Sequence, residues 1–201
     1  VCYDNQKLRI LEDLFAKSRP QRVIIFSSSK LKVKELAFAI KRMKFNVAAM
    51  HSDLEQAQRE EVMKDFKNGR IDILVATDIV ARGIDIDDIK LVINFDIPHD
   101  PEDYVHRIGR TARGTNGEGL AITFVAEHEQ AQFSRIEKFL EKSIYKIPIP
   151  PELGEAPAYE PEKHPESRGF RRPGSGGGDK GKGGGRQGGR PHFNKGPRPT
   201  K

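Results

Sequence analysis

Three arginines at three-residue intervals give this sequence its clearest chemical signal. Arg107, Arg110 and Arg113 lie in the stretch 104–113, which reads Tyr-Val-His-Arg-Ile-Gly-Arg-Thr-Ala-Arg. A guanidinium is permanently charged and presents a rigid fork of N–H donors that matches phosphate oxygens. We therefore interpret the series as part of a site that meets an anion. For an arbitrary run of arginines, a solvated basic surface is the simpler alternative.

The residues just upstream predict the element that carries this series. Asp100 suits a helix N-cap, Pro101 suits the first helical position, and Asp103 falls in the first turn. We predict a helix over Pro101–Arg110. The arginines then begin on the helix and run off its end near Gly109.

A second stretch with chemical potential is Ala76–Asp85, Ala-Thr-Asp-Ile-Val-Ala-Arg-Gly-Ile-Asp. It follows the apolar run Ile71–Val75, which we interpret as a strand. A strand that leads into Thr77-Asp78 and then into Gly83 is typical of a ligand-facing edge of a parallel sheet. The alternative is an ordinary strand-to-helix turn, in which Gly83 supplies only backbone freedom.

Short apolar runs alternate with amphipathic stretches along the first 147 residues. The predicted strands are Arg22–Ser27, Asn46–Met50, Ile71–Val75, Lys90–Phe95 and Gly119–Val125. The predicted helices are Asn5–Lys17, Lys30–Lys44, Leu54–Asn68, Pro101–Arg110 and His128–Leu140. This alternation, with almost continuously apolar strands, predicts an α/β fold whose parallel sheet is covered by helices on both faces. Ligands collect beyond the carboxyl ends of such strands.

Five stretches of this sequence together resemble the motifs of the C-terminal RecA-like domain of DEAD-box RNA helicases. They occur in the family's order and spacing, over about residues 1–145, and are Phe26–Lys30, Gln56–Arg59, Ala76–Asp85, Val92–Pro98 and His106–Arg113. The resemblance implies a RecA-like sheet. Ser52 and Ala112 stand where many family members carry glycine, and both are small changes.

The resemblance implies ATP as the cofactor and assigns residues to it. Arg110 and Arg113 would reach the γ-phosphate and stabilise charge that develops during phosphoryl transfer, as arginine fingers do. Asp85 would accept hydrogen bonds from the ribose, and Gly83 would let the backbone approach the nucleotide. Without the resemblance, solvation of Asp85 beside neighbouring acidic residues is the favoured alternative.

The resemblance also implies RNA as a partner. Ser29, Arg59 and Thr77 would contact the RNA backbone, because hydroxyl and guanidinium groups position phosphates without reading the bases. An ion pair with Glu55, four residues earlier on the same helix, is the alternative for Arg59. His106 is expected to organise an interface with another domain.

The sequence lacks the phosphate-binding loop, the Asp-Glu-Ala-Asp box and the Ser-Ala-Thr motif that the family carries on its first RecA-like domain. We therefore expect this chain to be the C-terminal half of a helicase and to be inactive alone. Its own N-terminal RecA-like domain would be its partner and would hold Mg²⁺; no metal site is predicted within this chain.

The charge of the chain is concentrated at one end. The net charge is +6, yet residues 168–201 hold ten Lys or Arg and one acid, so the remainder carries −3. Twelve of the 19 glycines also lie there, a composition that predicts a disordered, RNA-binding tail. We predict a helicase domain over 1–147, a Pro- and Glu-rich linker over 148–167 and the basic Gly-rich tail over 168–201.

The sequence also bears on location. Its single cysteine, Cys2, rules out an internal disulfide and fits a reducing compartment, and no apolar run is long enough to span a membrane. We therefore expect a cytoplasmic protein with no membrane partner.

Two alternative functions are kept open by the sequence. One is a non-catalytic RNA-binding or scaffold module that works through its basic tail. The other is a DNA helicase of the same superfamily. The sequence of residues 104–111 argues against this alternative, but only by resemblance.

Overall fold

The predicted parallel sheet is present in the structure, a computed structural model that describes residues 1–78, 89–111 and 119–163. These residues all belong to one unit, Val1–Ser167. The predicted site residues Gly83, Asp85 and Arg113 and the predicted disordered tail lie outside the described residues.

All five strands of the described chain run parallel in one sheet, in the order β2-β3-β1-β4-β5. The register sets Phe26 opposite both Ala76 and Asn94, so β1, β3 and β4 end at the same level. Met50 and Thr123 end the outer strands at that level too. The strands are β1 (Val23–Phe26), β2 (Val47–Met50), β3 (Ile73–Ala76), β4 (Leu91–Asn94) and β5 (Leu120–Thr123). Each lies within one or two residues of its predicted run.

The five predicted helices are also present, with ends that differ by at most two residues. They are α1 (Lys7–Lys17), α2 (Lys30–Arg42), α3 (Gln56–Lys67), α5 (Pro101–Ile108) and α6 (Gln130–Phe139). Short 3-10 turns are η1 (Asp4–Gln6), η2 (Glu127–Glu129) and η3 (Pro151–Leu153). No helix in the described part of the chain is long and apolar enough to cross a membrane.

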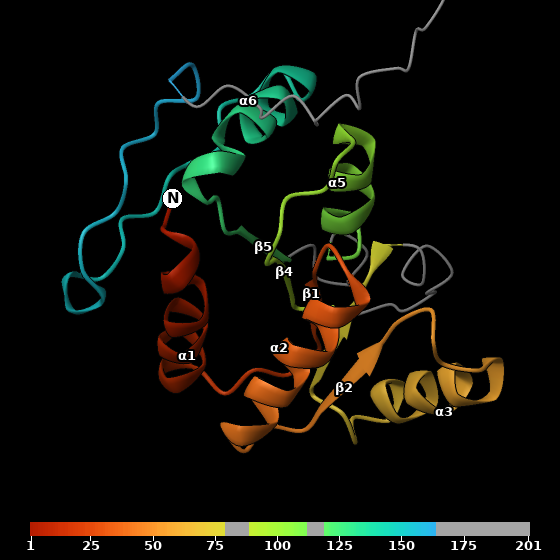
Figure 1. Ribbon diagram of the computed structural model, residues 1–201. Coiled ribbons are helices and arrows are strands. Elements are labelled where there is room, and N and C mark those ends of the chain that lie inside the picture. The colour runs from red at the N-terminus through yellow and green to blue at the C-terminus, as the bar shows by residue number, and fades with distance from the viewer. Residues whose placement is uncertain (79–88, 112–118, 164–201) are drawn as a thin grey trace, which may run out of the picture. The chain divides into compact units, whose positions relative to one another are not determined.

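Helices cover both faces of the sheet, as predicted. Val23 and Ile25 of β1 point into a core formed with α1 and α2, whereas Ile24 and Phe26 point into a second core with Phe66 of α3. Figure 1 shows α1 and α2 together on one side of the strands and α3 on the other. Alternate side chains of a strand face opposite sides, so a strand buried on both faces must be apolar throughout, as β1 is.

The helix that carries the arginine series packs against α6. Tyr104 of α5 meets Phe133 of α6 edge-on, with ring centroids 6.5 Å apart, in a third apolar cluster. Pro101 occupies the first turn of α5 and Gly109 caps its C-terminus, as predicted. Asp100 is the N-cap residue, as predicted, but its side chain makes no capping hydrogen bond. Its backbone carbonyl accepts from the N–H groups of Asp103 and Tyr104, at 3.1 and 3.4 Å.

The chain beyond α6 returns along the fold and is fastened to it by three buried or half-buried side chains. Gln6 Nε2 donates to the carbonyls of Leu153 and Glu155, at 3.1 and 2.9 Å. Gln130 bonds the backbone on either side of Tyr159, whose hydroxyl donates to Glu137 Oε2 at 2.6 Å. The described part of the predicted linker, residues 148–163, is therefore held against α6 and η1.

Candidate functional site

Arg107 lies at the centre of the carboxyl edge of the sheet and is only 3% exposed. Its Nε and Nη2 donate to the two carboxylate oxygens of Asp78, at 2.6 and 2.7 Å. Its Nη1 donates to Asn94 Oδ1 at 3.1 Å and to the carbonyl oxygen of Asp96 at 2.7 Å. The guanidinium also stacks over Phe26, 5.1 Å from the ring centroid. We expected all three arginines of the series to face an anionic ligand. This is wrong for Arg107, because its guanidinium nitrogens all donate hydrogen bonds within the protein.

Arg110 is placed differently, because α5 ends before it. It follows the cap Gly109, and its backbone N–H donates to the carbonyl of Arg107 at 3.1 Å. The side chain is half-buried, and its Nε donates to the carbonyl of His106 at 3.3 Å. The His106 side chain is exposed, with Nδ1 3.9 Å from Asp103 Oδ1.

Asp96 links the end of β4 to the loop after β1. This carboxylate is 3% exposed, and its Oδ2 accepts from Ser27 Oγ at 2.6 Å and from the Ser28 N–H at 2.9 Å. Its Oδ1 accepts from Lys32 Nζ at 2.9 Å, and Lys7 Nζ lies 3.7 Å away. Burial alone would raise the pKa of Asp96, but these donors outweigh it and hold the pKa well below the usual range.

Ser29 and Thr77 stand on the two neighbouring loops at this edge. Ser29 is exposed and caps α2, its Oγ accepting from the Lys32 N–H at 3.3 Å. The hydroxyl proton of Ser29 is not used by that bond. Thr77 directly follows β3, is half-buried, and donates its N–H to the Met50 carbonyl at 3.3 Å.

Arg59 lies farther along the same edge, near the loop after β2. Its Nη2 donates to the Ser52 carbonyl at 3.2 Å, while its Nε is buried and has no hydrogen-bond partner among the described residues. No ion pair joins it to Glu55 within the described chain, so that alternative is wrong. His51 Nδ1 is the other buried polar side-chain atom with no partner in the part of the chain described. Burial lowers the pKa of His51, with Lys34 adding to the effect, so this imidazole is neutral near pH 7.

The described site residues therefore gather on consecutive loops of one sheet edge. Ser29, Thr77 and Arg110 follow β1, β3 and α5, and Arg107 joins α5 to the β3 loop through Asp78. Sequence reasoning missed Arg107, Asp78, Asn94 and Asp96 as the framework of the site. The signal in the sequence was that Asp78 and Asp96 each lie two residues after an apolar strand and that Asn94 ends one.

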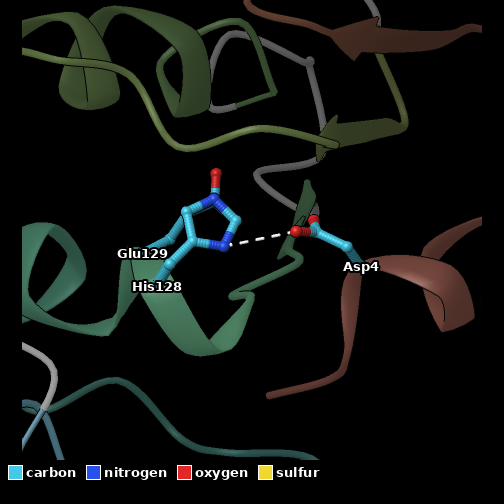
Figure 2. Close-up of side chains that lie close together, drawn as sticks. All are labelled: Asp4, His128 and Glu129. Atoms are coloured by element: carbon cyan, nitrogen blue, oxygen red, sulfur yellow. Dashed lines mark ion pairs between the residues drawn. The ribbon is translucent and has the colours of Figure 1, made fainter. Parts of the chain in front are cut away.

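Asp4, His128 and Glu129 form a group of possible metal ligands (Figure 2). His128 Nδ1 and Asp4 Oδ2 are 3.2 Å apart, as the dashed line marks. The ammonium of Lys7 already lies between the two carboxylates, 2.8 Å from Glu129 and 3.3 Å from Asp4. A cation would have to displace the buried Lys7, so we assign no metal to this group.

The carboxylates of the sheet edge do not suit a magnesium ion either. Asp78 is bound by the fork of Arg107, and Asp96 by Ser27, Ser28 and Lys32. Mg²⁺ needs carboxylate oxygens that are free to coordinate it. The described edge offers cationic and hydroxyl donors for phosphates, and the carboxylates of Asp78 and Asp96 are used internally.

Comparison with known proteins identifies the family. Residues 6–115 match the helicase conserved C-terminal domain, more than half of the chain. The DEAD-box ATP-dependent RNA helicase CshA of Geobacillus kaustophilus is 44% identical over 154 residues, which are 77% of this chain and 32% of that protein. The chain belongs to the C-terminal helicase domain family of DEAD-box proteins.

Solved structures agree with this DEAD-box assignment. The E. coli DEAD-box protein SrmB, solved bound to regulator of ribonuclease activity A, superposes with a TM-score of 0.71 at 34% identity, over 79% of this chain and 94% of that chain. S. cerevisiae Dbp5, bound to RNA and ADP BeF3, gives 0.65 at 32% identity, over 71% of this chain and 38% of that chain. The RecA-like fold predicted from the motifs is thereby confirmed. This DEAD-box domain spans about a third of the length of the curated relatives it matches.

Proposed function

We propose that this chain is the C-terminal half of an ATP-dependent RNA helicase and supplies arginine fingers and part of an RNA backbone site. One observation carries the proposal. The loops after β1 and β3, with Ser29 and Thr77, and the end of α5, with Arg110, lie at one edge of the sheet and share a hydrogen-bonded framework. A single edge thus presents hydroxyls and a guanidinium together.

On the nucleotide side, Arg110 and Arg113 act on the γ-phosphate of ATP. A guanidinium that meets charge formed only in the transition state raises turnover more than it tightens ATP binding. Asp85 accepts from the ribose hydroxyls, and Gly83 allows the backbone to approach the nucleotide. The half-buried position of Arg110 at the end of α5 supports its part in this assignment.

On the RNA side, Ser29, Thr77 and Arg59 hold backbone phosphates. The hydroxyl proton of Ser29, which the cap bond from Lys32 does not use, is a donor for an anion. The guanidinium of Arg59 makes no ion pair with Glu55 among the described residues. Such contacts fix the strand without reading its sequence. The Dbp5 structure with RNA and ADP BeF3 belongs to a similar chain and supports RNA as the substrate class.

The partner that completes both sites is an N-terminal RecA-like domain, and ATP and RNA draw the two domains together. His106, exposed on α5, faces that interface. Mg²⁺ is held by the N-terminal domain, in keeping with the internal use of Asp78 and Asp96 here. The single, unpaired Cys2 fits a cytoplasmic location.

The test joins this chain to its N-terminal domain and measures ATP turnover with single-stranded RNA. Arg110→Ala and Arg113→Ala should each lower kcat by about 10³-fold or more, in the range of arginine fingers, with a much smaller change in ATP affinity. Arg42→Ala is the matched control, because Arg42 is exposed at the C-terminal end of α2, whereas Ser29 caps the N-terminal end at the proposed site. Unchanged kcat in both finger variants contradicts the assignment, and RNA-stimulated turnover by this chain alone contradicts the half-enzyme.

A further inference from the structure

We propose that Arg107 is a positioning residue that couples RNA contact at Thr77 to the placement of Arg110. The inference rests on the proposed function and deepens it, because neither Arg107 nor Asp78 is among the residues proposed to touch ATP or RNA. It starts from the connectivity of one buried side chain. Arg107 is bonded to β3 through Asp78 and to β4 through Asn94 and Asp96, and it stacks on Phe26 of β1.

The geometry of the Asp78 pair makes this connection stiff. Both carboxylate oxygens of Asp78 are held, at 2.6 and 2.7 Å, by two different nitrogens of the same guanidinium. A paired fork of this kind fixes orientation as well as distance. A displacement of the Asp78 carboxylate must therefore move the Arg107 guanidinium or break two charge-assisted bonds.

Each end of the pair lies next to a residue of the proposed sites. Asp78 is the neighbour of Thr77 in the chain, and its side chain is 27% exposed, so this end lies at the rim. At the other end, the backbone carbonyl of Arg107 accepts from the N–H of Arg110 at 3.1 Å. The path from Thr77 to Arg110 thus consists of one peptide link, one forked ion pair and one backbone hydrogen bond.

The second RNA loop joins the same side chain. Arg107 Nη1 holds the carbonyl of Asp96, and the Asp96 carboxylate holds Ser27 and Ser28, just before Ser29. Every nitrogen of the Arg107 guanidinium is engaged, at 3% exposure, so the group has no alternative partner among the described residues. RNA contact at either loop therefore acts on a single rigid group that sets the end of α5.

The test uses the chain joined to its N-terminal domain and compares wild type, Arg107→Lys, Asp78→Asn and the double variant. ATP turnover is measured with saturating single-stranded RNA and without RNA, together with the Kd for each ligand. Lysine keeps the charge but cannot form the fork. We expect the ratio of turnover with RNA to turnover without RNA to fall roughly tenfold, within the usual 5–150-fold range of coupling between sites. The Kd for ATP and the Kd for RNA should each change less than about threefold, which is below the usual range of coupling between sites.

The ratio separates coupling from loss of folded protein, because inactive molecules lower both rates equally. Ile40→Val, a substitution at a fully buried core residue, is the control that lowers stability while leaving the ratio unchanged. Asp78→Asn provides a milder variant at the rim, and its effect on the ratio should not add to that of Arg107→Lys. If RNA stimulates turnover in both single variants as much as in the wild type, the coupling role of Arg107 is wrong, while the proposed function stands. A wild type without RNA-stimulated turnover overturns the proposed function and this inference with it.

Discussion

Replacing Asp96 by asparagine should destabilise the fold strongly, because this buried carboxylate holds two loops together. Asparagine keeps one acceptor oxygen, which can serve Ser27 and Ser28, but its amide then faces the ammonium of Lys32 at the former Oδ1 position. Hydrogen bonds to charged groups contribute about 1.5–3 kcal/mol, against about 0.5–1.5 for neutral pairs. Weakening the two buried bonds therefore costs about 2 kcal/mol. The Lys32 pair adds less than about 1 kcal/mol, since the Lys32 side chain is 52% exposed.

The expected loss is about 2–3 kcal/mol, which lowers Tm by roughly 4–12 °C in a chain of this size. The assay is thermal unfolding at pH 7, followed by circular dichroism. Asp53→Asn is the matched control, since Asp53 also accepts from two lysines, at 2.9 Å each, but on the surface. Asp53→Asn should lower Tm far less. Equal decreases in Tm for the two variants would refute the argument that burial makes the hydrogen bonds of Asp96 important for stability.

The same residue predicts a pH dependence with a definite sign. The folded-state pKa of Asp96 lies below its unfolded value of 3.8, so the unfolded chain binds the proton first as pH falls. The stabilisation is therefore complete near neutral pH and is lost as pH drops through and below 3.8. The gap in stability between wild type and Asp96→Asn should shrink by about 1 kcal/mol between pH 7 and pH 3. A gap that stays constant or widens in acid contradicts the assignment of a lowered pKa.

Two further predictions concern the chain beyond α6. Truncation after Ile147 should destabilise the fold by at least about 3 kcal/mol, because Gln6, Gln130 and Glu137 lose their backbone and Tyr159 partners. Truncation after Lys163 is its control, and equal Tm values for the two would instead support a domain that ends at residue 147. Deleting residues 168–201 should weaken RNA binding and lower the log–log salt slope by about 0.7 for each phosphate that the tail would neutralise, with Tm unchanged. Equal affinities and slopes with and without these residues would leave them a solubilising role only.

The sequence by itself determined the order of elements and the parallel sheet. Runs such as Val23–Phe26 are apolar at every position, as expected of a strand that is covered on both faces. In the helices between the strands, the spacing of apolar residues indicates which side chains point into the core. These signals are local, since each depends on residues within one strand or a few helical turns. For the same reason Pro101 and Gly109 marked the ends of α5 correctly.

Only the tertiary structure decided which arginine is buried within the protein and which stands at the rim of the sheet edge. Arg107 and Arg110 have the same side chain and stand three residues apart, so no local pattern separates them. The difference arises because the Arg107 side chain reaches Asp78, 29 residues earlier in the chain, while Arg110 falls beyond the cap of the helix. Residues 148–163 follow the same rule: their Pro- and Glu-rich composition indicates a linker, yet Gln6, more than 140 residues away, holds their backbone in place. Partners at such separations are fixed by packing, which composition and periodicity do not contain.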